Sequence, residues 1–140
     1  AILQTLADRP GADAKAFFEL AVVADLGKDY AQAETYYLRA LDADPAFAVA
    51  QNNLAMRYVL EERRLDEALK LAQAAVQAGP DNANYLDTLA QAQAALGNYD
   101  DAIQALTRAA ELDPNQRKWR DNIEVIKQRQ KQTSSGARES

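Results

Sequence analysis

Three series of alanines return along this chain at a spacing of 34 or 35 residues, and prolines follow the same period. The alanines are Ala21, Ala55 and Ala90, then Ala33, Ala68 and Ala102, then Ala40, Ala75 and Ala109. The prolines are Pro10, Pro45, Pro80 and Pro114. A period of this size indicates an array of stacked repeats rather than a globular fold around one central core. It predicts repeat units at 11–45, 46–80 and 81–114.

Each unit has the pattern of two antiparallel helices. In the first unit, Phe17, Leu20, Ala21 and Ala24 make a helical apolar stripe, which predicts a helix over about 13–26. A second helix is expected over about 30–43. It ends before Asp44-Pro45, because proline disfavours helical geometry in the residue that precedes it. The turn at 61–64 in the second unit lacks glycine and is one residue longer, so we expect it to be extended or mobile.

The two ends of the chain depart from the repeat. Residues 1–10 end in a proline that is in phase with the others, and they are predicted to form the second helix of a truncated preceding repeat. Residues 115–131 predict one amphipathic helix with Trp119, Ile123 and Ile126 on one stripe and a polar opposite face, as in a capping helix. The polar segment 132–140 is expected to be disordered. Because the chain opens without Met, we interpret it as a fragment of a longer protein.

The segments LGKDYAQAETYYLRALDADP and LGNYDDAIQALTRAAELDP, with their equivalent in the second unit, resemble tetratricopeptide repeats. The resemblance covers residues 11–114. It implies an all-α fold, a right-handed α-solenoid of antiparallel helix pairs. One departure concerns the large aromatic residue that the family has early in the first helix. It is present as Phe17 but replaced by Gln51 and Leu86.

In this family the first helix of each pair lines a concave face, and helical spacing predicts which side chains would point there. These candidate groove residues, interpreted as a peptide-binding surface, are Lys15, Phe18, Val22, Val49, Asn52, Asn53, Met56, Asn84, Asp87, Thr88 and Gln91. Their amides both donate and accept hydrogen bonds, which suits an extended peptide backbone. Asn53 and Asn122 resemble part of the asparagine ladder of peptide-holding arrays. The alternative is that these are ordinary solvent-facing residues of an alanine-rich scaffold.

A receptor for the C-terminal carboxylates of chaperones is not favoured. Relatives with that function resemble one another in placing cations along the groove, and here Asn53 matches that pattern. The usual cationic positions, however, hold Phe18, Asn84 and Thr88.

Catalysis and cofactor chemistry find no support in the sequence. The chain has no Cys and no His, which excludes a thiolate nucleophile, an imidazole base and a Cys/His zinc site. Carboxylate pairs such as Asp100-Asp101 occur at turns and helix starts, where acids cap free amides. We therefore expect no enzyme, no metal and no cofactor.

Nucleic acid and membrane partners are also not expected. Residues 1–114 carry 9 basic and 18 acidic side chains, whereas nucleic-acid binders need a basic stripe. The 7 basic and 3 acidic residues of 115–140 suit the end of a helix. No apolar run approaches the roughly 20 residues that span a bilayer.

The predicted function is a protein-interaction scaffold that binds a peptide segment or partner helix in its groove, as one domain of a larger protein. Two alternatives stay open. One is a self-associating assembly module that uses the exposed terminal repeat, and the other is a substrate-recruiting domain of a larger enzyme. The composition suggests a bacterial source, and cytoplasm and periplasm are both compatible with it.

Overall fold

The computed structural model describes residues 13–139, which form seven helices and no strand. The helices are α2 (Ala14–Leu26), α3 (Tyr30–Ala43), α4 (Ala48–Leu60), α5 (Leu65–Ala78), α6 (Ala83–Ala95), α7 (Tyr99–Leu112) and α8 (Lys118–Glu139). The helix predicted for residues 1–10 lies outside the described residues.

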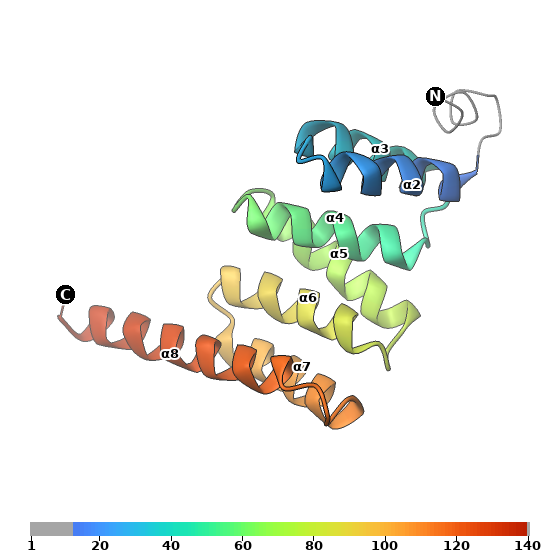
Figure 1. The fold of residues 1–140 in the computed structure, drawn as a ribbon. Helices are drawn as coiled ribbons and strands as arrows, with labels where there is room; N and C mark the ends of the chain where they lie inside the picture. The colour runs from blue at the N-terminus through green and yellow to red at the C-terminus, as the bar shows by residue number, and fades with distance from the viewer. Residues whose placement is uncertain (1–12, 140) are drawn as a thin grey trace.

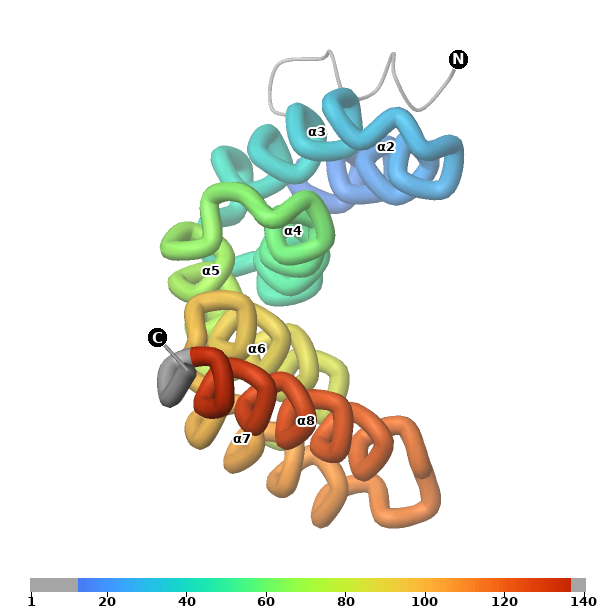
Figure 2. The backbone as a smooth tube through the Cα atoms, turned by 90° about the vertical axis from the view of Figure 1, so that its left-hand side faces the viewer, coloured from blue at the N-terminus to red at the C-terminus, as the bar shows by residue number. Residues whose placement is uncertain are grey.

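The helices are arranged as a right-handed α-solenoid of antiparallel pairs. The pairs α2–α3, α4–α5 and α6–α7 follow one another, and α8 packs on α7 after the last pair. In Figure 1 the first helices of the pairs and α8 form one layer, with α3, α5 and α7 behind them. Figure 2 shows that the stack is curved rather than straight. The all-α solenoid predicted from the repeat is confirmed.

Short polar residues start several of the helices. The side chains of Asp13, Asp29 and Asn82 accept hydrogen bonds from backbone N–H groups three residues further on, at 2.9, 3.2 and 3.1 Å. Each bond satisfies one of the free donors in a first helical turn. The turn between α6 and α7 uses Gly97 at φ 85°, a left-handed conformation that glycine adopts without strain.

The turn between α4 and α5 differs from the expectation of an extended or mobile loop. Glu62 and Arg64 adopt left-handed conformations, with φ of 53° and 51°. The backbone N–H groups of Glu62 and Arg63 donate to the carbonyls of Val59 and Tyr58, both at 3.1 Å. Arg63 also pairs with Glu34 of α3. The extra residue is therefore accommodated in a compact, hydrogen-bonded turn rather than an extended one.

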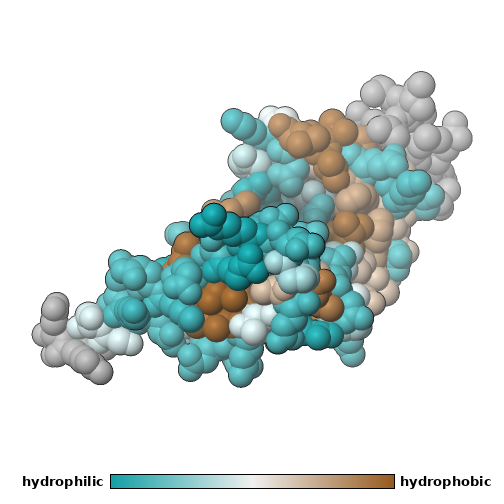
Figure 3. All heavy atoms as spheres, turned by 60° about the horizontal axis from the view of Figure 1, so that its bottom comes forward, coloured by the Kyte–Doolittle hydropathy of each residue, from teal (hydrophilic) through white to brown (hydrophobic). Residues whose placement is uncertain are grey.

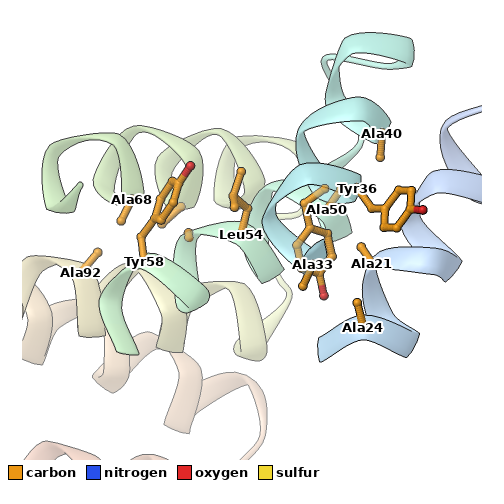
Figure 4. Packing of buried hydrophobic residues seen from close by; sticks show 13 residues of the cluster. Ala21, Ala24, Ala33, Tyr36, Ala40, Ala50, Leu54, Tyr58, Ala68 and Ala92 are labelled. Atoms are coloured by element: carbon orange, nitrogen blue, oxygen red, sulfur yellow. The ribbon is translucent and has the colours of Figure 1, made fainter. Parts of the chain in front are cut away.

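The core consists of small residues at the helix crossings with a few large side chains between them. Alanines with no exposed surface, including Ala33, Ala55 and Ala90, let the helix backbones approach closely. Tyr37 and Tyr58, each 1% exposed, fill the remaining space. Figure 4 shows Tyr58 pointing from α4 toward α5, and alanines on the facing sides of α2 and α3.

Helix α8 packs its apolar stripe on the preceding repeat, and it is longer than the predicted helix over 115–131. Trp119 and Ile126 are buried in the C-terminal core cluster, while the opposite side of the helix is exposed and polar. Seen toward this end in Figure 3, the surface is mostly hydrophilic.

The expected disorder over 132–140 is not what the structure shows, because α8 continues to Glu139. Residues 128–132 are good helix formers without Gly or Pro, so nothing local ends the helix after 131. Two contacts with α7 also hold this part of α8. Gln130 donates to Asp100 at 2.8 Å, and the hydroxyls of Thr133 and Tyr99 are 3.2 Å apart.

Candidate functional site

A pocket of about 420 Å³ lies where α4, α6 and the start of α8 meet, and we refer to it as the central pocket. Its lining residues are Val49, Asn52, Asn53, Met56, Asn82, Asn84, Tyr85, Asp87, Thr88 and Lys118. Two consecutive repeats and the capping helix therefore contribute to one surface. Uncharged amides and apolar groups dominate it.

Seven of the eleven candidate groove residues line this pocket, and they come from α4 and α6. Helical spacing predicts such residues because positions three and four apart share a face. Asn82 was not among the candidates because it precedes α6 as its N-cap, outside the helical pattern. Tyr85 also lies off the predicted stripe. For these two, only the packing of α6 beside α4 reveals that they line the pocket.

The two neighbouring amides of Asn52 and Asn53 in α4 leave the Asn52 acceptor without a partner among the described residues. Asn52 Nδ2 donates to Asn53 Oδ1 at 3.1 Å, and Asn53 Nδ2 donates to the Tyr37 hydroxyl at 3.5 Å. Asn52 Oδ1 is buried and receives no hydrogen bond. An unsatisfied buried acceptor is costly. A ligand N–H could reach Asn52 Oδ1 only after the Asn52 side chain turns, because this atom has no exposed surface.

Asp87 and Thr88 line the pocket but are mostly engaged within the protein. Asp87 is 7% exposed and accepts hydrogen bonds from Asn122 at 3.0 Å and Gln91 at 3.2 Å. Its second oxygen is 3.8 Å from Lys118 Nζ. Thr88 is 3% exposed, and its hydroxyl donates to the Asn84 carbonyl at 3.2 Å. Asp87 therefore joins α6 to α8 and leaves little surface for a ligand.

The other four candidate residues, Lys15, Phe18, Val22 and Gln91, do not line the central pocket. Phe18 packs inward, with ring centroids 6.1 Å from Tyr37 and 5.3 Å from Phe47. Lys15 is exposed and Val22 is half-buried on α2. The structure therefore places the α2 candidates apart from the pocket that α4 and α6 share.

Polar contacts connect the first repeat to the second beside the pocket. Arg57 of α4 pairs with Asp25 of α2 at 2.8 Å and stacks 3.8 Å from the centre of the Tyr30 ring. The Tyr37 hydroxyl donates to the other Asp25 oxygen at 3.2 Å. Burial raises the pKa of Tyr37 to about 12, and Asp25 contributes to the increase.

A second polar cluster links α3 to the α4–α5 turn. Glu34 accepts hydrogen bonds from the Tyr58 hydroxyl, at 3.0 Å, and from Arg63. Burial by itself would raise the pKa of Glu34, but the bonds from Arg63 and Tyr58 outweigh it and lower this pKa below the ordinary 4.5. Burial and the bond to Glu34 raise the pKa of Tyr58 to about 12.

Glu34→Gln is expected to lower the free energy of unfolding at pH 7 by about 1 kcal/mol, a modest cost because Arg63 is partly exposed. A carboxyl with a lowered folded-state pKa stabilises the fold above its unfolded pKa. That contribution is lost as pH falls through the folded value. Urea denaturation at pH 7 and pH 3 should therefore show the gap between wild type and variant narrowing at pH 3. A gap of equal size at both pH values would contradict this assignment.

Within residues 13–139, no group of three or more acidic, His or Cys side chains could hold a metal ion. None of the described helices is long and apolar enough to cross a membrane.

Comparisons with known proteins agree on the family. Two family profiles, both described as tetratricopeptide repeat, match residues 59–121 and residues 1–46. None of the curated proteins matches the chain.

Several solved structures resemble this chain over most of its length. The first TPR of Spaghetti (RPAP3), bound to the HSP90 peptide SRMEEVD, has a TM-score of 0.77 and 23% identity, covering 85% of this chain and 94% of that one. MamA from Desulfovibrio magneticus RS-1 has a TM-score of 0.78 and 21% identity, covering 90% of this chain and 71% of that one. The O-GlcNAc transferase mutant of Thermobaculum terrenum has a TM-score of 0.75 and 25% identity, covering 81% of this chain but 22% of that one. The profile matches, the repeat period and the stacked helix pairs together show that the chain belongs to the tetratricopeptide-repeat family.

Proposed function

We propose that this chain is a protein-interaction module that holds an extended peptide segment or a partner helix in the central pocket. The family and its fold support a protein-interaction scaffold. The observation that carries the finer proposal is the pocket shared by α4, α6 and α8, with the amide residues Asn52, Asn53 and Asn84 among those that line it. A ligand backbone would exchange hydrogen bonds with these amides.

Apolar contacts are expected to supply most of the binding energy. Val49 and Met56 line the pocket from α4 and are both partly exposed. Buried apolar anchors usually dominate the energetics of an interface, with amides around them setting orientation. Phe18, Val22, Lys15 and Gln91 remain proposed contacts for a ligand long enough to extend beyond the pocket.

An acidic C-terminal tail is not the ligand that we propose. The RPAP3 domain is seen with the peptide SRMEEVD, but the central pocket here contains one cation, Lys118, which lies near the Asp87 carboxylate. A terminal carboxylate would meet amides and a buried acid instead of a cluster of cations. The peptide SRMEEVD therefore serves as a negative control.

The test begins with selection of peptides from a random displayed library on the immobilised 140-residue chain. Binding of the selected peptides is then measured by fluorescence polarisation with wild type and with Asn53→Ala plus Met56→Ala. We expect the double variant to bind at least tenfold more weakly, because it removes an apolar anchor and an amide of the pocket. Circular dichroism checks that the variant keeps the wild-type helix content.

The matched control is Lys70→Ala plus Gln73→Ala, which changes two exposed residues of α5 and should leave affinity unchanged. Equal affinity of the pocket variant and wild type for every selected peptide would overturn the proposal. So would tight binding of SRMEEVD that depends on Lys118.

Self-association is the alternative that a specific observation favours. Val23 and Leu26 of α2 and Leu60 of α4 are 60%, 80% and 63% exposed, and contact with a second copy of the chain would bury their apolar surface. A concentration series by sedimentation velocity separates the two functions, since only an assembly module would shift to larger species as concentration rises. The third candidate, a substrate-recruiting domain of an enzyme, draws on the transferase likeness, which covers 22% of that chain.

A further inference from the structure

A second hollow of about 370 Å³ lies in repeat two, at the end of the α4–α5 pair opposite its turn. It is lined by Pro45, Ala46, Gln51, Ala74, Gln77 and Ala78. None of these residues lines the central pocket. Its walls are mainly the small apolar groups of alanine and proline.

Gln51 supplies a polar group to this hollow that is only half satisfied. Its side chain is 7% exposed, and its Nε2 donates to the Pro45 carbonyl at 2.8 Å. The other amide atom, Oε1, is buried and has no hydrogen-bond partner among the described residues. A buried acceptor without a donor is costly, so this site favours a group that brings an N–H or O–H.

The first and third repeats fill the corresponding space with their own side chains. The position of Gln51 is taken by Phe17 in repeat one and by Leu86 in repeat three. In repeat one the guanidinium carbon of Arg39 lies 5.7 Å from the centre of the Phe17 ring.

Repeat two has an alanine at the position that Arg39 takes in repeat one. The position of Arg39 is taken by Arg108 in repeat three but by Ala74 in repeat two. Repeat two thus lacks both the ring and the long side chain beside it. A hollow remains, and the Gln51 side chain forms part of its wall.

We propose that this hollow binds a tryptophan side chain of a partner protein. In repeat one the Phe17 ring and the Arg39 side chain pack side by side. Repeat two has Gln51 and Ala74 at these positions, which leaves room for a flat ring beside Gln51. The alanine and proline walls match the apolar faces of an indole. Gln51 Oε1 has no exposed surface in the free protein, so the side chain would turn this oxygen toward the hollow when the ring binds, and the indole N–H would then donate to it.

The probe for this site is N-acetyl-L-tryptophanamide, titrated into the 15N-labelled chain and followed by NMR. We expect the largest shifts at the Gln51 side-chain amide and at the backbone amides of Ala74 and Ala78. The analogue methylated at the indole nitrogen, which has no indole N–H, should bind about tenfold more weakly. N-acetyl-tyrosinamide and N-acetyl-phenylalaninamide should also bind more weakly than the tryptophan probe.

Two variants test the geometry from opposite walls. Gln51→Phe restores an aromatic ring at this position, and Ala74→Arg restores the cation of repeats one and three. Each should abolish the shifts caused by the probe, and circular dichroism should show unchanged helix content. If one variant fails to fold, the other still decides the question. Asn53→Ala plus Met56→Ala is the matched control and should bind the probe like wild type, which keeps this site separate from the proposed function.

Three results would overturn the proposal. The first is equal binding of the parent probe and the analogue methylated at the indole nitrogen, since Gln51 Oε1 would then play no part. The second is equal or tighter binding of the tyrosine probe. The third is a set of shifts at Val49 and Met56 that survives Gln51→Phe, because the probe would then occupy the central pocket.

Discussion

Tyr58→Ala is expected to lower the free energy of unfolding by about 3–5 kcal/mol. Tyr58 is 1% exposed and packs between α4 and α5, so its removal leaves a cavity that the surrounding helices cannot fully close. The variant also removes the hydrogen bond to Glu34 and the ring over which Arg63 lies, 5.1 Å from its centre. Because domains are typically stable by only about 5–15 kcal/mol, a large fraction of the total stability would be lost.

Urea denaturation followed by circular dichroism measures this loss. Tyr58→Phe is the control, because it keeps the ring and removes only the hydroxyl, and it should cost about 1 kcal/mol. If both variants lost equal stability, the hydroxyl rather than the packed ring would dominate. A loss below about 1 kcal/mol for Tyr58→Ala would contradict the packing described above.

Ala90→Leu is expected to lower the free energy of unfolding by about 3 kcal/mol, the upper part of the range for overpacked cores. Ala90 has no exposed surface and belongs to the cluster that joins α6, α7 and α8. A leucine has no space there unless the helices separate. Such a separation would also shift Asp87 and Lys118, which lie on α6 and α8 at the central pocket.

Ala31→Leu on the exposed surface of α3 is the matched control, with an expected change within about 0.5 kcal/mol. Both variants are compared by thermal and urea denaturation. A stable Ala90→Leu variant would mean that the helices can move apart without cost. It would then remove the physical reason for alanine at the periodic positions.

The local parts of the fold could be predicted from the sequence because their causes are local. The apolar stripe of each helix depends on residues three or four positions apart, and the alanine and proline period shows that this pattern returns every 34 or 35 residues. Together they indicated the helix pairs that the structure confirms. The last part of α8 was missed for a related reason. Its polar composition suggested disorder, but the helix-forming residues 128–132 and the contacts of Gln130 and Thr133 with α7 favour the helix, which continues through Gly136 to Glu139.

The candidate site could be predicted only in part. Helical spacing identifies the residues that share a face, and seven of the eleven candidates do line the central pocket. Helical spacing does not predict how much of each side chain a neighbouring helix buries. Asp87 and Thr88 were therefore expected as contacts although α8 and the local backbone engage them. Phe18, expected in the groove, packs against Tyr37 and Phe47.

The sequence by itself determined the repeat, the helix pairs and the departure from an aromatic residue at Gln51. Only the tertiary structure decided that Gln51 and Ala74 lie on opposite walls of one hollow, and that Asn52 Oδ1 is buried without a partner. The physical reason is that burial and pairing depend on the distances between helices far apart in sequence. Those distances follow from the rotation and packing of whole helix pairs, which a pattern within one helix does not contain.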